Sequence, residues 1–221
     1  MQATCYMCGA AATSSEHAPP KCFFPEANLT GHDLRRNLIT VPSCDLHNAA
    51  KSKDDEYLRA IILLAAGASS EVAKAHFFDK LLRAVKRTPH VHAAFIKPVG
   101  LKLDIGEMLE IDLARFNRCI SAIATAIFFH KYGIKLERSL HVISPNLYAQ
   151  NQASVEVPAP HLAAIDVTRT FLAHETTGGE NPAVFMYRAR YDSEGGLYAF
   201  AAVFYEAFEV FCATQRASSA A

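Results

Sequence analysis

The two motifs that most constrain how this chain can fold lie close to its start. Cys5-x-x-Cys8 is followed by Cys44-x-x-His47, which opens 36 positions beyond Cys8. Three thiolates and one imidazole form the tetrahedral ligand set that suits structural zinc. The segment between the motifs is rich in turn-forming proline, asparagine and glycine, as expected if two knuckles fold back to meet. The spacing therefore predicts a zinc site made of Cys5, Cys8, Cys44 and His47.

The other three cysteines, Cys22, Cys119 and Cys212, have no partners at ligand spacing, and we interpret them as small apolar residues. Six cysteines in a chain with no export-type leader favour free thiols and metal over disulfides. The most apolar stretches, residues 60–68 and 120–129, are too short to span a bilayer. We therefore expect a cytoplasmic protein that does not associate with a membrane.

The first 50 residues lack the long apolar periods of a core that can stand alone, so a bound metal would have to supply stability there. The rest of the 221-residue chain has such periods. We therefore divide the chain into a metal-stapled unit, residues 1–66, and a second domain, residues 67–221.

Apolar periodicity and helix-breaking residues predict helices at residues 45–66, 71–87, 106–132 and 161–174. The middle of the third helix is apolar nearly all round, which is typical of a buried central helix. Two aromatic-rich segments, 183–191 and 197–211, flank a turn with the sequence Asp-Ser-Glu-Gly-Gly and predict an antiparallel hairpin or small sheet. The expected fold class is α+β, with a mainly helical second domain.

An acid and an imidazole stand side by side at Glu16 and His17, between the two metal-type motifs. Taken in order, the motifs resemble the zinc-stapled HNH endonuclease family, in its His-Asn-Asn form. The matching positions are Cys5 and Cys8, Glu16-His17, Asn37-Leu38, Cys44 with His47, Asn48 and Lys51. The match covers roughly the first 55 residues, and the resemblance implies a ββα-metal module, with two short strands and a helix around one divalent ion.

The resemblance also implies roles for these residues in phosphodiester hydrolysis. His17 would be the general base, because a neutral imidazole suits proton transfer near pH 7. Asn37 would orient His17. Glu16 and Asn48 would bind the catalytic ion, and their hard oxygen atoms suit Mg²⁺ or Mn²⁺.

Two points of this assignment stay open in the sequence. The usual family layout has a second cysteine where His47 stands and a histidine where Asn48 stands. We interpret His47 as the fourth zinc ligand, and the alternative makes His47 the catalytic-ion ligand and leaves zinc with three cysteines. The helical spacing also allows Asp55 or Glu56 to approach the metal centre or to hold Lys51, whereas Asp54 is expected to be a solvated charge.

The formal net charge of zero and the sequence pI of about 7.1 give no general support for nucleic-acid binding. Residues 71–103 are the basic exception, with seven Lys or Arg and two acidic residues. We expect phosphate contacts in this segment and around the candidate active site. The predicted contact residues are Arg35, Arg36, Lys51, Lys80, Arg83, Lys86 and Arg87.

These observations together predict a metal-dependent endonuclease that hydrolyses phosphodiester bonds, and the resemblance favours DNA over RNA. Residues 67–221 would recognise the target or a protein partner, and a homodimer is compatible with the sequence. By analogy of context, such a protein could serve restriction or antiphage defence. The alternative function is a non-catalytic zinc module that binds nucleic acid or another protein.

Overall fold

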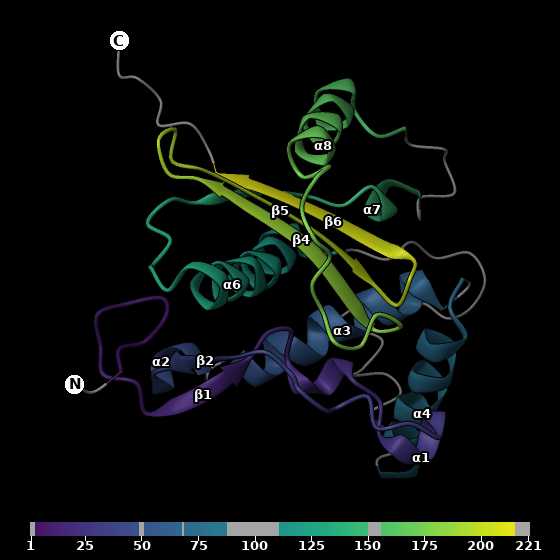
Figure 1. Cartoon of the computed structure of the whole chain (residues 1–221). Coiled ribbons are helices and arrows are strands. Elements are labelled where there is room, and N and C mark those ends of the chain that lie inside the picture. The colour runs from purple at the N-terminus through teal and green to yellow at the C-terminus, as the bar shows by residue number, and fades with distance from the viewer. Residues whose placement is uncertain (1–2, 49–50, 68, 88–110, 150–155, 215–221) are drawn as a thin grey trace.

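The structure is a computed structural model that describes residues 3–48, 51–67, 69–87, 111–149 and 156–214, with the backbone alone described at 81–87 (Figure 1). Its first half contains β1 (Ser14–His17), η1 (Lys21–Phe23), α1 (Ala27–Thr30), β2 (Thr40–Ser43), α2 (Asp45–Asn48), α3 (Ser52–Ala66) and α4 (Glu71–Arg87). Its second half contains α6 (Leu113–Tyr132), β3 (Leu140–Ile143), α7 (Asn146–Ala149), α8 (Ala159–Phe171), β4 (Phe185–Asp192), β5 (Leu197–Phe204) and β6 (Phe208–Thr214). The fold is thus a mixed α+β fold, as predicted.

The two short strands of the first half pair with each other and lead directly into helix. β1 and β2 run antiparallel, with Ser14 opposite Ser43 and Glu16 opposite Val41. Because side chains alternate along a strand, Glu16 lies on the buried face of this ribbon and His17 on the other. α2 begins two residues after β2, so the second metal-type motif spans the junction of strand and helix.

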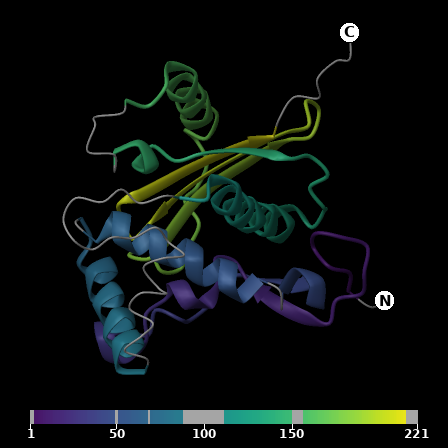
Figure 2. The same ribbon diagram turned by 180° about the vertical axis from the view of Figure 1, so that it is seen from behind.

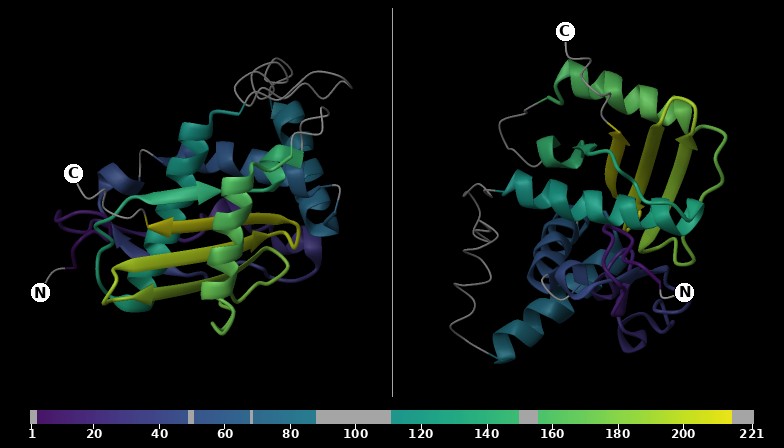
Figure 3. Two further views of the ribbon diagram at one scale, coloured as in Figure 1. Left: turned by 90° about the horizontal axis from the view of Figure 1, so that it is seen from above. Right: turned by 90° about the vertical axis from the view of Figure 1, so that its left-hand side faces the viewer.

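The second half contains a four-stranded antiparallel sheet in the order β3-β6-β5-β4. α6 covers one face of this sheet and α8 covers the other (Figures 1 and 3). α3 packs against α6 and also contacts β6 of the sheet, and Figure 2 shows it from behind. α6 also contacts β2 and therefore stands between the β1–β2 ribbon and the sheet.

α6 is the buried central helix that its sequence predicts, with Ile120, Ala124 and Ile127 fully buried. Its N-terminus is capped by Asp112, whose carboxylate accepts a hydrogen bond of 2.9 Å from the backbone nitrogen of Arg115. The predicted start at residue 106 falls outside the described residues. The cap shows that the described helix begins at Leu113, because Asp112 itself has an extended backbone.

The buried core is continuous between the two halves of the chain. Phe23 from the first half packs against Phe204 from β5, with ring centroids 5.5 Å apart. Tyr6 and Phe208 belong to the same buried cluster. The first half therefore completes its core with apolar side chains from the second, whereas the division into domains at residues 66 and 67 stays a prediction.

The structure corrects two of the predicted elements. The helix expected over residues 45–66 is observed as α2 and α3, and residues 49–50 between them lie outside the described residues. The segment 197–211, expected to be one strand of a hairpin, forms β5 and β6 around a turn at Tyr205 and Glu206. Both turn residues have positive φ, 49° and 59°, and neither belongs to the residue types that usually mark such a turn.

This turn predicts a stabilising substitution. Glu206 has φ 59°, a left-handed conformation that costs a residue with a Cβ about 1 kcal/mol. We expect Glu206→Gly to raise the free energy of unfolding by roughly that amount, measured by urea denaturation. Glu194→Gly, in a turn where positive φ occurs at Gly196 rather than at Glu194, is the control and should give no such gain. Equal effects of the two substitutions would contradict the strain argument.

Candidate metal centre

Three cysteines and one histidine come together where the loop before β1 meets α2. One ligand atom from each of Cys5, Cys8, Cys44 and His47 lies within 4.8 Å of all the others. The Sγ atoms of Cys8 and Cys44 are 3.8 Å apart, and His47 Nδ1 lies 3.5 Å from Cys5 Sγ and 3.2 Å from Cys44 Sγ. Tetrahedral zinc with ordinary bond lengths sets the S–S distance at about 3.8 Å and the S–N distance at about 3.6 Å. The four residues therefore fit a structural zinc ion, as the sequence predicts.

The backbone around this cluster favours a thiolate. Burial by itself would raise the pKa of Cys5, but hydrogen bonds from the backbone at Met7, Cys44 and Cys8 overcome it and lower the pKa to about 6. A thiolate is the form that binds zinc. Lys135, in the loop that follows α6, donates a hydrogen bond to the backbone oxygen of Cys8, so the second half of the chain holds this knuckle in place.

The remaining thiols behave as their sequence context predicts. None of Cys22, Cys119 and Cys212 belongs to the cluster, and none forms a disulfide. Burial raises the pKa of Cys22 and of Cys119 to about 11 and raises that of Cys212 further. They are protonated thiols, with Cys119 and Cys212 buried and Cys22 partly buried against the core.

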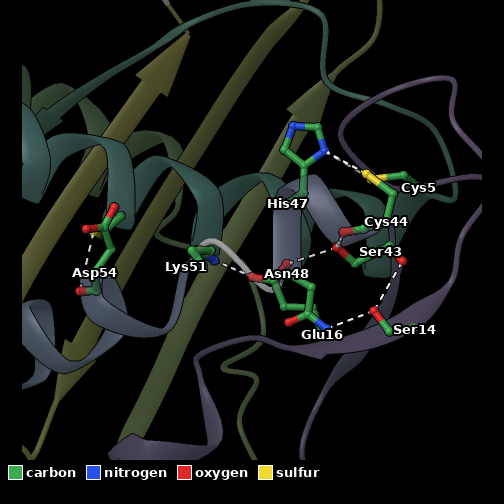
Figure 4. Close-up of polar contacts among 10 residues, drawn as sticks. Cys5, Ser14, Glu16, Ser43, Cys44, His47, Asn48, Lys51 and Asp54 are labelled. Carbon is green, nitrogen blue, oxygen red and sulfur yellow. Dashed lines mark hydrogen bonds and ion pairs between the residues drawn. The ribbon is translucent and has the colours of Figure 1, made fainter.

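The geometry separates the two neighbours His47 and Asn48. His47 points its Nδ1 atom toward the sulfur atoms of Cys5 and Cys44, so it belongs to the cysteine cluster (Figure 4). The side-chain amide of Asn48 instead donates a hydrogen bond of 2.8 Å to Ser14 Oγ on β1. Of the two alternatives in the sequence, this arrangement favours zinc with His47 as its fourth ligand and leaves Asn48 beside β1.

Glu16 is a buried carboxylate with two partners. It is 6% exposed and lies on the inner face of β1. Lys51 Nζ donates to Glu16 Oε1, and Ser43 Oγ donates to Glu16 Oε2 at 3.4 Å (Figure 4). The ion pair between Glu16 and Lys51 compensates a charge that would otherwise be costly to bury.

His17 has a half-buried side chain and no hydrogen-bond partner among the residues that the structure describes. Burial lowers the pKa of His17, the nearby charge of Lys21 lowers it further, and Glu16 opposes both effects. The imidazole is therefore neutral near pH 7, with its nitrogen atoms available to an external group.

Among the described residues, no hydrogen bond joins the side chain of Asn37 to His17. Asn37 is exposed, lies before β2, and has a left-handed backbone with φ 52°. The segment around it is held by Asn181, whose side chain donates a hydrogen bond of 3.2 Å to the backbone oxygen of Arg36. The role of Asn37 in orienting His17 stays a prediction.

The predicted phosphate-binding residues differ in their exposure and in the contacts that their side chains already make. Arg35 donates a hydrogen bond of 2.9 Å to the backbone oxygen of Phe24 and forms an ion pair with Glu26. Its guanidinium therefore stabilises the local chain conformation. Arg36 is exposed. Lys51 pairs with Glu16, and Lys80 lies on α4 and is partly buried. The side chains of Arg83, Lys86 and Arg87, on the last turns of α4, lie outside the described part of the chain.

Three polar residues of this centre have no signal in the sequence. Ser14 and Ser43 reach Asn48 and Glu16 because strand pairing sets them opposite each other. Tyr6, inside the first cysteine motif, is fully buried. Only the register of β1 against β2 could have indicated the two serines.

Asp54, expected to be a solvated charge, instead forms an ion pair of 2.7 Å with Arg115 of α6.

Comparisons of this chain with protein-family models, with curated proteins and with solved structures found no match. Among the described residues, no helix combines the length and the apolar character needed to span a bilayer. Any inference about function therefore rests on the residues of the site itself.

Proposed function

We propose that this chain is a metal-dependent phosphodiesterase of the HNH type that cleaves nucleic acid, with DNA favoured over RNA. The observation that carries this proposal is the placement of three residues around one short ribbon. Glu16 and His17 share β1, and Asn48 reaches β1 from α2 beside a cluster that fits structural zinc. A zinc module that only stabilises the fold has no need of a buried carboxylate and an unpartnered imidazole at this place.

His17 supports the role of general base. Hydrolysis of a phosphodiester needs a water made nucleophilic, and a neutral imidazole can accept the proton of that water near pH 7. The imidazole of His17 is neutral near pH 7, because burial and Lys21 lower its pKa. Its nitrogen atoms are free to accept a proton, because it has no hydrogen-bond partner among the described residues. Its position on the less buried face of β1 leaves it accessible to a substrate.

Glu16 and Asn48 support the binding of a divalent cation. Both side chains offer oxygen atoms, and these suit Mg²⁺ or Mn²⁺ better than softer metals. A cation bound there would supply Lewis-acid stabilisation of the negative charge that develops on the phosphate and the leaving oxygen. The two side chains would hold this charge on the buried face of β1, in the same short strand that carries His17 on its other face.

A cleavage assay on the full chain tests this proposal. We expect supercoiled plasmid DNA to be cut with Mg²⁺ or Mn²⁺ and to stay intact with EDTA, and a structured RNA tested in parallel would show the substrate preference. Glu16→Gln keeps the size of the side chain and removes its charge, so the cleavage rate should fall at least about 100-fold.

Glu137→Gln is the matched control, because Glu137 is exposed in the loop that follows α6. It should cleave at the rate of the unmodified protein. Cleavage by the Glu16→Gln variant at an undiminished rate would refute the assignment of Glu16.

A second candidate function is a non-catalytic zinc module that binds nucleic acid or another protein. Two observations favour it: Lys51 already neutralises Glu16, and Asn37 is exposed and makes no hydrogen bond to His17 among the described residues. This function predicts zinc-dependent binding of DNA, RNA or a protein with no cleavage under any metal condition. The same assay therefore separates the two candidates.

A further inference from the structure

The first turns of α3 carry a second carboxylate close to the proposed cation site of Glu16 and Asn48. Lys51 is the N-cap of this helix, and Asp55 lies four positions later and so on the same helical face. Asp55 Oδ1 is buried and has no hydrogen-bond partner among the described residues. A buried carboxylate oxygen without a partner costs stability, so a feature of this kind in a folded chain calls for a ligand.

Tyr6 provides an independent sign of the same kind. Its side chain is fully buried, and its hydroxyl has no partner in acceptable hydrogen-bond geometry within the described part of the chain. The hydroxyl interacts with the Glu16 carboxylate, and the charge of Asp55 also acts on it. A phenol from the cysteine knuckle and a carboxylate from α3 thus both interact with Glu16, and Asp55 Oδ1 is left without a hydrogen-bond partner among the described residues.

Charged groups of both signs surround Asp55, and most of them already have partners. Burial raises the pKa of Asp55 to about 6, Lys51 and Arg59 oppose the shift, and Glu16 and Asp54 add to it. Lys51 is already paired with Glu16, and Asp54 is paired with Arg115. Glu16 therefore has the Lys51 ammonium as a direct ion-pair partner, whereas Asp55 has no ion-pair partner among the described residues and only the charges of Lys51 and Arg59 near it.

We propose that Asp55 is a further oxygen ligand of the divalent cation that Glu16 and Asn48 would bind, and that Lys51 takes the place of this cation in the ion-free protein. This inference rests on the proposed function, because it concerns the same site. A doubly charged cation in place of the ammonium would neutralise both carboxylates. The released Lys51 would be available to a phosphate, which is where the sequence expects it.

Direct measurement of Mn²⁺ binding to the zinc-loaded full chain, by titration calorimetry without nucleic acid, tests this assignment. Asp55→Asn keeps the shape of the side chain and removes its charge. We expect this variant to bind Mn²⁺ at least tenfold more weakly than the unmodified protein and to have a higher melting temperature without Mn²⁺. Opposite changes in ion affinity and in ion-free stability are the signature of a ligand, since a merely structural residue would lose stability.

Glu56→Gln is the matched control. The structure leaves Glu56 exposed, next to Asp55 in sequence and without a hydrogen bond to the site. It should bind Mn²⁺ as the unmodified protein does. Equal Mn²⁺ affinity of the Asp55→Asn variant and the unmodified protein, or no Mn²⁺ binding by the unmodified protein, would overturn the assignment.

Lys51→Met provides a second measurement that does not depend on how Asp55→Asn folds. Removal of the ammonium should lower the melting temperature of the ion-free protein and enlarge the increase that Mn²⁺ produces. An increase no larger than in the unmodified protein would also overturn the assignment. These results are separate from the proposed function, because cleavage that survives with normal Mn²⁺ affinity in Asp55→Asn would refute this inference alone.

Discussion

Cys44→Ser should abolish zinc binding and unfold the region around β1 and β2. Cys44 Sγ lies 3.8 Å from Cys8 Sγ and 3.2 Å from His47 Nδ1, so its loss breaks the ligand set that joins the first knuckle to α2. Structural zinc in small zinc-finger peptides contributes roughly 10–16 kcal/mol at pH 7. This large contribution makes Cys44→Ser one of the two most consequential single changes in the chain.

Elemental analysis and circular dichroism check this expectation. The unmodified protein should contain one zinc ion per chain and the Cys44→Ser variant none, and the variant should melt at a much lower temperature. Cys22→Ser is the matched control, because Cys22 lies outside the cluster and its pKa is raised by burial. It should keep its zinc. Retention of zinc by the Cys44→Ser variant would show that the cluster is not the metal site.

His17→Ala should reduce cleavage strongly while leaving the fold intact. Removal of a positioned general base typically lowers the rate by 10²–10⁴-fold, and roughly that loss is expected here. The side chain is half-buried and makes no hydrogen bond to the described part of the protein, so its truncation leaves no partner unsatisfied. A loss of activity without a loss of stability would therefore report on chemistry.

Initial cleavage rates and melting temperatures should be measured on the same samples. His174→Ala is the matched control, because His174 is exposed after α8. It should keep full activity. Cleavage by the His17→Ala variant at the rate of the unmodified protein would remove His17 from the mechanism, and an unchanged zinc content in both variants would show that the metal cluster stays intact.

Much of the fold could be predicted because its signals are local. The apolar period of α6 and the turn at residues 192–196 are visible within a few residues, and both are found in the structure. The division of segment 197–211 into β5 and β6 was missed for a physical reason. Tyr205 and Glu206 adopt positive φ without the glycine or asparagine that announces such a turn, so local propensity gives no warning.

The sequence predicted which residues form the candidate site better than it predicted the contacts between them. Spacing placed the three cysteines and His47 together, and the structure gathers them. The partners of Glu16 could not be read from spacing, because Ser43 and Lys51 reach it only through strand pairing and the start of α3. Asp55 was one of two acids that the helical period left open, and only burial distinguishes it from the exposed Glu56.

The sequence by itself determined which four residues would gather into a zinc-type cluster and which segments would be helical, since ligand chemistry and periodicity are properties of short stretches. Only the tertiary structure decided how the two halves of the chain hold each other. The hydroxyl of Tyr205 donates a hydrogen bond to the backbone oxygen of Phe23, which is 182 positions earlier in the chain. The same hydroxyl lies 3.1 Å from His76 Nδ1. Contacts over such separations depend on how the whole core packs, and that packing has no local signature.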